Sequence, residues 1–285
     1  MPSTDLSLAP LTSEAGVFRV LALDHRDAFR NALRQAGVLD VSDDQILRTK
    51  ARIVRALAPR ATSVLLDPAA VPRCRVEGAG LLVPLEEQGH EPFEGGRLNR
   101  LVEGGAATAA SLDADACKLL LYYRADHLPT AKRQLDLVAR AAEAGHAHGL
   151  PLILEPLVYQ LEGETDEQYR GRYADLVAAG AEHLAGSGAD LLKLQYPGSA
   201  AGCAPLNAAS APLPWTLLGG SDVDGETFAG QLEVASGAGA AGFIAGRAIW
   251  GGSLGLPALE QQAWLENEAA PLFARLCDIV DAAAQ

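Results

Sequence analysis

Two lysines and one glutamate stand inside segments that are otherwise apolar. Lys118 lies in Ala-Cys-Lys-Leu-Leu-Leu, Lys193 in Asp-Leu-Leu-Lys-Leu-Gln, and Glu155 in Leu-Glu-Pro-Leu. Lysine is rarely buried without a partner. One interpretation is a buried ion-pair network with Glu155 at its centre, although such networks often stabilise proteins poorly once desolvation is counted. We favour the other interpretation, which is catalysis by an amine.

An amine must be uncharged to attack a carbonyl, and lysine with its usual pKa of about 10.4 is protonated at neutral pH. An apolar strand and a second ammonium group both lower that pKa. Lys193 is therefore predicted to condense with a ketone, with Lys118 as the second ammonium. The iminium withdraws electrons from the adjacent carbon–carbon bond, which then breaks. Glu155 is predicted to move the protons that these steps require.

A candidate anion site lies near the end of the chain. Gly246 and Arg247 stand where an apolar run passes into a short helix, and Gly219, Gly220 and Ser221 close the preceding apolar run. Barrel enzymes often bind phosphate at this place through backbone amides. Arg247 adds a charge that can donate two hydrogen bonds. Ordinary turns and a surface salt bridge are the plainer explanation, but the combination favours phosphate.

Eight short apolar runs alternate with longer Ala-rich stretches, and these elements must position the polar residues. Continuous apolar runs are typical of parallel strands covered on both faces. The predicted strands are Val17–Leu23, Thr62–Asp67, Gly80–Leu85, Ala116–Tyr123, Leu152–Leu157, Asp190–Gln195, Trp215–Gly219 and Gly242–Ala245. The predicted helices are Asp27–Ala36, Asp44–Ala58, Leu128–His146, Asp166–Leu184, Gly225–Ser236 and Leu256–Ala284.

Eight strand–helix units in 285 residues predict an α/β fold, a single (β/α)8 TIM barrel over residues 1–285, in preference to a doubly wound sheet. The carboxyl ends of barrel strands face one mouth, which would gather Asp24, Asp67, Glu86, Lys118, Glu155 and Lys193. The segments Glu87–Arg97 and Pro197–Pro214 are expected to be active-site loops, because they follow the third and sixth strands and are rich in Gly, Pro and small residues.

Composition excludes several classes of partner. The net charge of −13 argues against nucleic-acid binding, which needs a basic surface. No apolar run reaches about 18 residues, so no membrane span is expected, and without a basic and apolar leader we expect a cytoplasmic protein. The motif Gly-Ala-Gly-Ala-Ala-Gly at 237–242 matches a dinucleotide-binding pattern, but it is predicted to close a helix and enter a strand, the reverse of the binding arrangement.

Five segments together resemble the family of class I tagatose-1,6-bisphosphate aldolases and sulfofructose-phosphate aldolases. They are Leu21–Arg26, Lys118–Tyr123, Leu154–Leu157, Gly188–Lys193 and Gly242–Trp250, in the family's order. The resemblance implies a barrel that cleaves a ketose phosphate to dihydroxyacetone phosphate and an aldehyde, with neither metal nor other cofactor.

By motif position, the resemblance implies that Lys193 is the Schiff-base lysine and Glu155 the proton shuttle. It likewise implies Lys118 as the supporting lysine, Asp24 as the carboxylate of the first strand and Arg247 as the phosphate-binding arginine. Barrels of this kind commonly assemble, so a homo-oligomer is expected.

The sequence departs from the family in two places near the substrate's charged ends. His25 stands where the family usually has Gln, and the turn at 218–222 reads Leu-Gly-Gly-Ser-Asp with one residue more than expected. His25, Arg26 and Arg124 are candidates for contacting the aldehyde half, which carries a phosphate in tagatose bisphosphate and a sulfonate in the sulfosugar. Two other functions remain open: a non-catalytic regulatory barrel that binds sugar phosphates, and a sugar-phosphate isomerase that needs a carboxylate but no imine.

Overall fold

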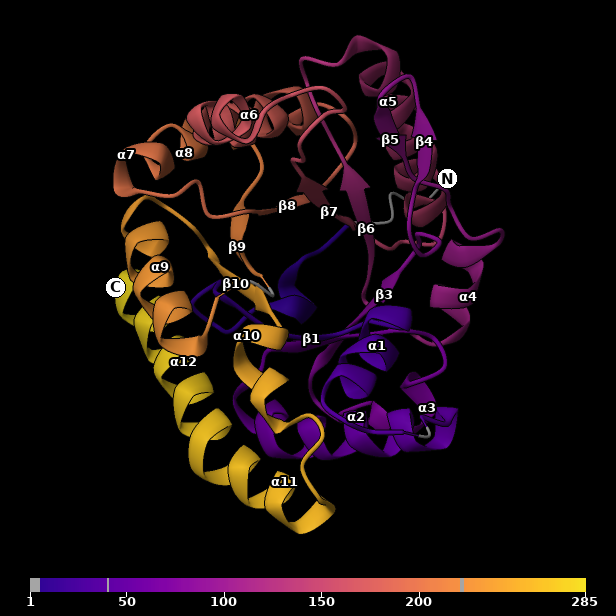
Figure 1. Cartoon of the computed structure of the whole chain (residues 1–285), viewed down its shortest axis with the longest axis vertical. Coiled ribbons are helices and arrows are strands. Elements are labelled where there is room, and N and C mark those ends of the chain that lie inside the picture. Colours follow the sequence, from indigo (N-terminus) through magenta and orange to yellow (C-terminus); the bar gives the residue numbers. More distant parts are fainter. Residues whose placement is uncertain (1–5, 40, 221–222) are drawn as a thin grey trace.

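Eight parallel strands close into a barrel in the computed structural model of this chain, which describes residues 6–39, 41–220 and 223–285. Their order around the ring is β1-β10-β9-β8-β7-β6-β3-β2, and Figure 1 shows them surrounded by helices. Every strand begins and ends within one residue of its predicted position, so the predicted barrel is confirmed. The strands are β1 (Phe18–Leu23), β2 (Ser63–Leu66), β3 (Gly80–Pro84), β6 (Ala116–Tyr122), β7 (Leu152–Leu157), β8 (Leu191–Leu194), β9 (Trp215–Gly219) and β10 (Gly242–Ala245).

Five long helices also lie within one residue of prediction: α1 (Asp27–Gln35), α2 (Asp43–Leu57), α5 (Leu128–His146), α6 (Asp166–Ala185) and α9 (Gly225–Gly237). Side-chain caps explain two of their starts. Ser42 accepts a hydrogen bond from the Gln45 amide at the start of α2, and Thr165 and Gln168 form a capping box at the start of α6. Such caps satisfy amides that have no partner within the helix.

The remaining helices differ from prediction. The C-terminal helix, predicted as one element, consists of α11 (Ala258–Trp264), a π-helical turn η4 (Leu265–Ala269) and α12 (Ala270–Ala283). The segment 197–214, predicted as a loop, contains two short helices. The short helices and 3₁₀ turns are η1 (Ala9–Leu11), η2 (Ala58–Arg60), α3 (Val71–Cys74), α4 (Gly105–Ser111), α7 (Ala200–Cys203), α8 (Leu206–Ser210), α10 (Arg247–Trp250) and η3 (Gly251–Ser253).

The segment 87–97 was also predicted as a loop, but it contains most of an antiparallel hairpin. Its strands are β4 (Glu91–Phe93) and β5 (Gly96–Leu98), and Glu91 pairs with Leu98. An isolated bridge between Glu86 and Leu101 closes the base of the hairpin. The loop after β3 is therefore an ordered structure and not an irregular loop.

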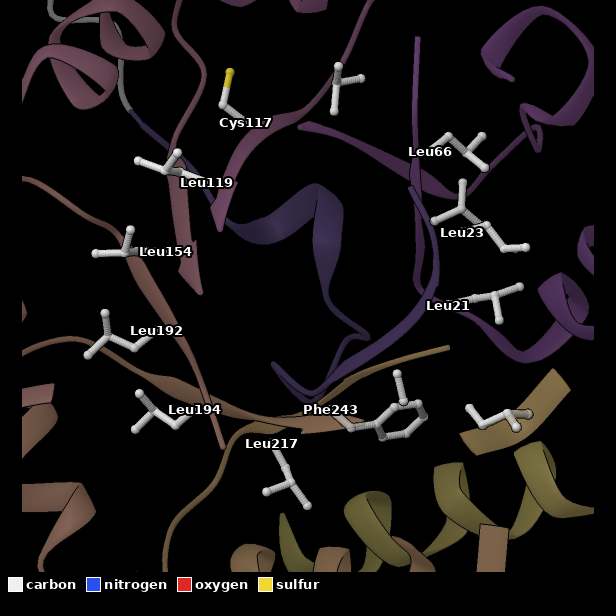
Figure 2. Packing of buried hydrophobic residues seen from close by; sticks show 14 of the residues in the cluster. Leu21, Leu23, Leu66, Cys117, Leu119, Leu154, Leu192, Leu194, Leu217 and Phe243 are labelled. Carbon is white, nitrogen blue, oxygen red and sulfur yellow. The ribbon is translucent and has the colours of Figure 1, made fainter. Parts of the chain in front are cut away.

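Alternation along the strands decides which side chains enter the barrel. Cys117 and Leu119 of β6, and Leu192 and Leu194 of β8, belong to the apolar layer between barrel and helices, and Figure 2 shows these side chains directed outward. Successive side chains of a strand point to opposite faces. The residues between them therefore point inward, and Lys193 is one of these.

The other end of the barrel is closed. Leu11 of η1 packs with the interior residues Phe18, Val20 and Leu82. The Thr62 hydroxyl donates a 2.7 Å hydrogen bond to the Leu11 carbonyl, just before β2 begins. The N-terminal segment therefore covers the amino ends of the strands, and the polar residues lie at the opposite end.

Two further sequence expectations concern the helix–strand boundary at 237–242 and membranes. Gly237 ends α9 and Gly242 begins β10, so the motif closes a helix and enters a strand as predicted. Gly242 has φ 138°, and a Cβ atom there would lie 2.0 Å from the Phe18 carbonyl oxygen. Within the three described ranges, no helix is both long enough and apolar enough to span a bilayer.

Candidate active site

Most of the predicted site residues gather around one cavity of about 620 Å³ at the carboxyl ends of the strands. The expectation for Asp67 was wrong, because its carboxylate does not line the cavity and pairs with the buried Lys50 of α2. Ser221, also predicted for this site, lies outside the described residues. The predicted residues that line the cavity are Asp24, His25, Arg26, Lys118, Glu155, Lys193, Gly219, Gly220, Gly246 and Arg247. Glu86, Tyr122 and Gln195 also line it.

Glu155 stands between the two lysines. Its Oε2 atom lies 3.0 Å from the Lys193 Nζ and 3.0 Å from the Lys118 Nζ. Strand register produces this contact, because Leu154 of β7 pairs with Leu192 of β8 and the next residue on each strand points inward. All three side chains are at least 93% buried, so the amine of Lys193 faces the carboxylate and not bulk water.

Lys118 is the centre of the ion-pair network, whereas the ion-pair interpretation of the sequence placed Glu155 there. Besides Glu155, its Nζ atom lies 3.0 Å from Asp24 Oδ2 and 2.7 Å from Glu86 Oε1. Glu86 also accepts a 3.1 Å hydrogen bond from the Leu120 amide. The sequence placed Glu86 at a strand end but gave it no role, and this structure shows that it positions Lys118.

The charges of this cluster reinforce one another. Burial alone would lower the pKa of Lys118, but Asp24, Glu155 and Glu86 outweigh it and raise that pKa well above its usual value. Burial would likewise raise the pKa of Glu155, but Lys118 and Lys193 beside it lower that pKa below its usual value. At neutral pH the cluster therefore contains an ammonium at Lys118 and a carboxylate at Glu155 that can accept a proton.

The pKa values of Asp24 and His25, which directly follow β1, are also shifted by burial and by the charges of this cluster. Burial opposes the charge on Asp24, but Lys118 lowers its pKa far below the usual value. Burial lowers the pKa of His25 to about 4, with Arg247, Lys193 and Lys118 acting in the same direction and Asp24 opposing them. His25 is therefore neutral at physiological pH and offers hydrogen bonds in place of a charge.

The candidate anion site consists of close-packed glycines and an arginine. A Cβ atom on Gly246 would lie 2.5 Å from the Ala22 carbonyl oxygen, and one on Gly219 would lie 2.3 Å from the Ala245 Cβ. Only glycine allows the backbone to pass so closely at these two positions. The buried Nε atom of Arg247 has no hydrogen-bond partner among the described residues, so this guanidinium keeps a donor for a ligand.

Arg26 and His25 lie together at the first loop of the cavity. Arg26 donates a 2.8 Å hydrogen bond to the Glu86 carbonyl oxygen. Its Nε atom and the Nδ1 atom of His25 are buried and have no hydrogen-bond partner in the described part of the chain, although Asp24 Oδ1 lies 3.8 Å from that Nδ1. The His25 ring packs edge-to-face on Trp250, with the ring centres 5.5 Å apart. Both side chains therefore keep unused donors or acceptors beside the cavity.

The expectation for Arg124 was wrong. Its guanidinium is buried away from the cavity, at 2.9 Å from Asp126 and 2.6 Å from Glu164. The chain leaves the barrel after Tyr122, so the inward alternation of β6 does not extend to residue 124. Arg124 fixes the loops after β6 and β7 and does not line the cavity.

The chemistry of the donor set bears on metal binding. In the described residues, no group of three or more His, Cys, Asp or Glu side chains is arranged to hold a metal ion. The carboxylates of Asp24, Glu86 and Glu155 converge on an ammonium group instead.

A barrel with a buried lysine–glutamate pair at its mouth suits an enzyme that acts on carbonyl compounds. Residues 18–252 match the sequence model of the DeoC/LacD family of aldolases, and the chain belongs to that family. It is accordingly a carbon–carbon lyase, as the sequence predicted, and the resemblance stated above is confirmed.

Curated relatives resemble the chain along most of its length. Tagatose 1,6-diphosphate aldolase 2 of Streptococcus mutans serotype c is 28% identical over 276 residues, which cover 87% of this chain and 84% of the relative. Tagatose 1,6-diphosphate aldolase 2 of Streptococcus pyogenes serotype M1 is 27% identical over 299 residues, covering 93% of this chain and 91% of the relative.

Solved structures agree with the fold. A Schiff-base-forming fructose-1,6-bisphosphate aldolase is 20% identical and superposes with a TM-score of 0.66, covering 97% of this chain and 99% of that one. An archaeal fructose 1,6-bisphosphate aldolase is also 20% identical, with a TM-score of 0.64 and coverage of 95% and 99%. At this identity the likeness confirms the barrel and leaves the substrate open.

Proposed function

We propose that this aldolase cleaves a phosphorylated ketohexose through an imine on Lys193, giving dihydroxyacetone phosphate and an aldehyde, without metal or other cofactor. The observation that carries the proposal is the Glu155 carboxylate 3.0 Å from the buried amine of Lys193. The names of the curated relatives favour tagatose 1,6-bisphosphate as the substrate. The 6-deoxy-6-sulfofructose 1-phosphate type is the second possibility, and it differs only at the aldehyde end.

The first half of the reaction forms the imine. Glu155 accepts a proton from Lys193, and the freed amine attacks the ketone carbon to give a carbinolamine. Glu155 returns the proton to the carbinolamine oxygen, which leaves as water and produces the iminium. Because Lys118 stays protonated, it holds the carboxylates of Asp24, Glu86 and Glu155 in place through both transfers.

The second half breaks the carbon–carbon bond. Glu155 takes the proton of the substrate hydroxyl at C4, the C3–C4 bond breaks, and its electron pair moves to the iminium nitrogen. The aldehyde leaves, and an enamine remains on Lys193. Protonation at C3 restores an iminium, and water then hydrolyses it to dihydroxyacetone phosphate and the free lysine.

Charged groups at the cavity suit the substrate's ends. Arg247, with Gly219, Gly220 and Gly246 beside it, would bind the phosphate of the dihydroxyacetone half. His25 and Arg26, with their unused polar atoms, would contact the aldehyde half. Ser221 is proposed as an additional phosphate contact from its sequence position. Self-association and a cytoplasmic location also stay predictions.

Borohydride trapping tests the proposal. Wild-type enzyme treated with tagatose 1,6-bisphosphate and sodium borohydride should gain the mass of a reduced ketose or triose adduct at Lys193, mapped by peptide mass spectrometry. Lys193→Met should abolish both labelling and turnover, whereas the exposed Lys132 offers a control in Lys132→Met. An active wild-type enzyme without the adduct would overturn the imine route.

The same experiment separates the alternatives. A regulatory barrel would bind sugar phosphates without turnover, and Lys193→Met would leave its regulation intact. An isomerase would convert ketose phosphate to aldose phosphate, and Lys193→Met would cost it little.

A further inference from the structure

The guanidinium of Arg97 lies over two tyrosine rings, one of which belongs to the lining of the cavity. Its Cζ atom is 5.1 Å from the centre of the Tyr122 ring and 4.7 Å from the centre of the Tyr159 ring. Tyr122 lines the cavity. A guanidinium that stacks on aromatic rings through its faces keeps the N–H groups at its edge for other partners. Arg97 does not itself line the cavity but packs on a residue that does, and no described residue accepts a hydrogen bond from its guanidinium.

Arg97 differs from other arginines around it, because it forms no ion pair with any described carboxylate. Arg100, on the same hairpin, pairs with Glu91, and Arg124 is held by Asp126 and Glu164. In a chain with a net charge of −13, an arginine without an ion pair that packs on a cavity-lining tyrosine is a candidate contact for an anionic ligand. The cation–π contacts fix its position without neutralising it.

The platform that carries Arg97 is rigid. Its backbone N–H donates a 2.9 Å hydrogen bond to the Tyr159 hydroxyl. Gln134 of α5 donates a hydrogen bond to the Arg97 carbonyl and a 2.9 Å bond to the Tyr122 carbonyl, and the Tyr122 amide donates a 2.8 Å bond to Asn99. The hairpin is therefore fastened to β6 and α5, and the guanidinium needs little reorganisation to bind a ligand.

Barrel topology places this guanidinium across the mouth from the first anion site. Arg247 follows β10, and Tyr122 ends β6; in the ring of eight strands these two are four positions apart in either direction. In Figure 1 the β4–β5 hairpin lies on the β6 side and α10 lies on the other side. Lys193, on β8, lies between the two walls. A substrate bound covalently to Lys193 can extend one end toward each arginine.

We propose that Arg97 binds the second anionic group of the substrate, the one on the aldehyde half, and so makes the enzyme selective for ketoses charged at both ends. This inference rests on the proposed aldolase function and deepens it. The ligand chemistry is a phosphate or sulfonate oxygen that accepts hydrogen bonds from the guanidinium edge. Arg97 would add a charged contact to those proposed for His25 and Arg26 on the aldehyde half, and it is accordingly a specificity-determining residue of the distal subsite.

Two substrates that differ only in the distal phosphate give the test. Arg97→Met should lower kcat/KM for tagatose 1,6-bisphosphate by about 10- to 100-fold, the value of one charge-assisted contact, and should leave kcat/KM for tagatose 1-phosphate within about twofold. Arg97→Lys should recover part of the loss. Arg100→Met removes a charge from the same hairpin and should change neither substrate, which makes it the matched control.

An equal change for both substrates, or no change for either, would overturn the inference and leave Arg97 a structural residue. A direct measurement of binding tests the role of Arg97 independently of imine formation. In a Lys193→Met background, calorimetry should show that Arg97→Met weakens binding of the bisphosphate and not of the monophosphate. Failure to trap an adduct at Lys193 would refute the proposed function, while the binding difference would still decide the role of Arg97.

Discussion

Glu155 and Lys193 occupy adjacent inward positions on β7 and β8, and their side chains meet at 3.0 Å. The backbone register of two parallel strands sets this contact, so no flexible loop has to close to form it. Catalytic groups on strands are held more precisely than groups on loops. The pair is therefore preorganised for proton transfer. Substitutions of the pair and of the residues around it should each change a different measurable property.

Replacing the carboxylate should separate binding from chemistry. Glu155→Gln keeps the shape of the side chain but cannot accept the proton of Lys193, so kcat should fall by about 100- to 10,000-fold. Coupled detection of dihydroxyacetone phosphate measures the loss, and thermal unfolding checks that the fold persists. The exposed Glu91 provides the control Glu91→Gln, and a kcat within tenfold of wild type would contradict the assigned role.

Removing the ammonium group of Lys118 should destabilise the folded protein. Lys118→Met leaves Asp24, Glu86 and Glu155 buried near one another without their shared partner, a loss of about 3–5 kcal/mol in the free energy of unfolding. Urea unfolding at neutral pH measures it. Adding Glu86→Gln removes one unpaired charge and should restore part of the stability. Lys132→Met, on the exposed face of α5, should be nearly neutral.

His25 should make stability depend on pH. Its pKa is about 4 in the folded protein against 6.5 for an ordinary histidine, so the unfolded chain binds a proton first as the pH falls. Stability should therefore decrease between about pH 6.5 and pH 4, by up to about 3 kcal/mol, and His25→Gln should remove this slope. Asp24 and Glu155 act at lower pH, because their pKa values lie below the usual values of 3.8 and 4.5.

Urea unfolding of both proteins across this pH range measures the difference, and the His25 ring resonances in an NMR titration give the pKa directly. Parallel stability curves for wild type and His25→Gln would show that the histidine does not titrate as described.

The phosphate turn should not tolerate a methyl group. In Gly246→Ala the new Cβ would lie 2.5 Å from the Ala22 carbonyl oxygen, so the backbone beside Arg247 must move. We expect KM for the phosphorylated substrate to rise by about tenfold or more, and the free energy of unfolding to fall by about 1–3 kcal/mol. Gly251→Ala is the matched control, since its nearest neighbour is the Arg247 Cβ at 4.0 Å. Equal kinetics for the two variants would refute the close-packing argument.

Chelation should leave the activity unchanged. Dialysis against EDTA, followed by elemental analysis and assay in metal-free buffer, should give the same kcat as untreated enzyme, because the proposed electron sink is the iminium on Lys193. A zinc-dependent aldolase treated in parallel is the control. Loss of activity that added zinc restores would contradict the amine mechanism.

Strand periodicity made most of the site predictable. Lys118, Glu155 and Lys193 interrupt apolar strands at inward positions, so their convergence can be predicted from the sequence. Glu86 was harder to assign, because it follows β3 and its direction depends on the bridge to Leu101. That bridge pairs residues on either side of the hairpin, and such long-range pairing leaves no local pattern.

The loops account for the errors. The hairpin β4–β5 lies in a segment rich in Gly and Pro. Its strands are three residues long, which is too short to show an alternation of apolar and polar residues in the sequence. Arg124 was misplaced for a related reason. Its position next to β6 suggested the cavity, but Asp126 and Glu164 hold it outside, and pairing between different loops cannot be deduced from one strand.

The closed floor of the barrel has a consequence for the order of events. Leu11 and η1 block the amino ends of the strands. Substrate and products must therefore enter and leave at the carboxyl ends of the strands. The aldehyde, cut from the outer half of the sugar, is free to depart while the inner fragment is still tethered to Lys193. Product release should therefore be ordered, with the aldehyde first and dihydroxyacetone phosphate second.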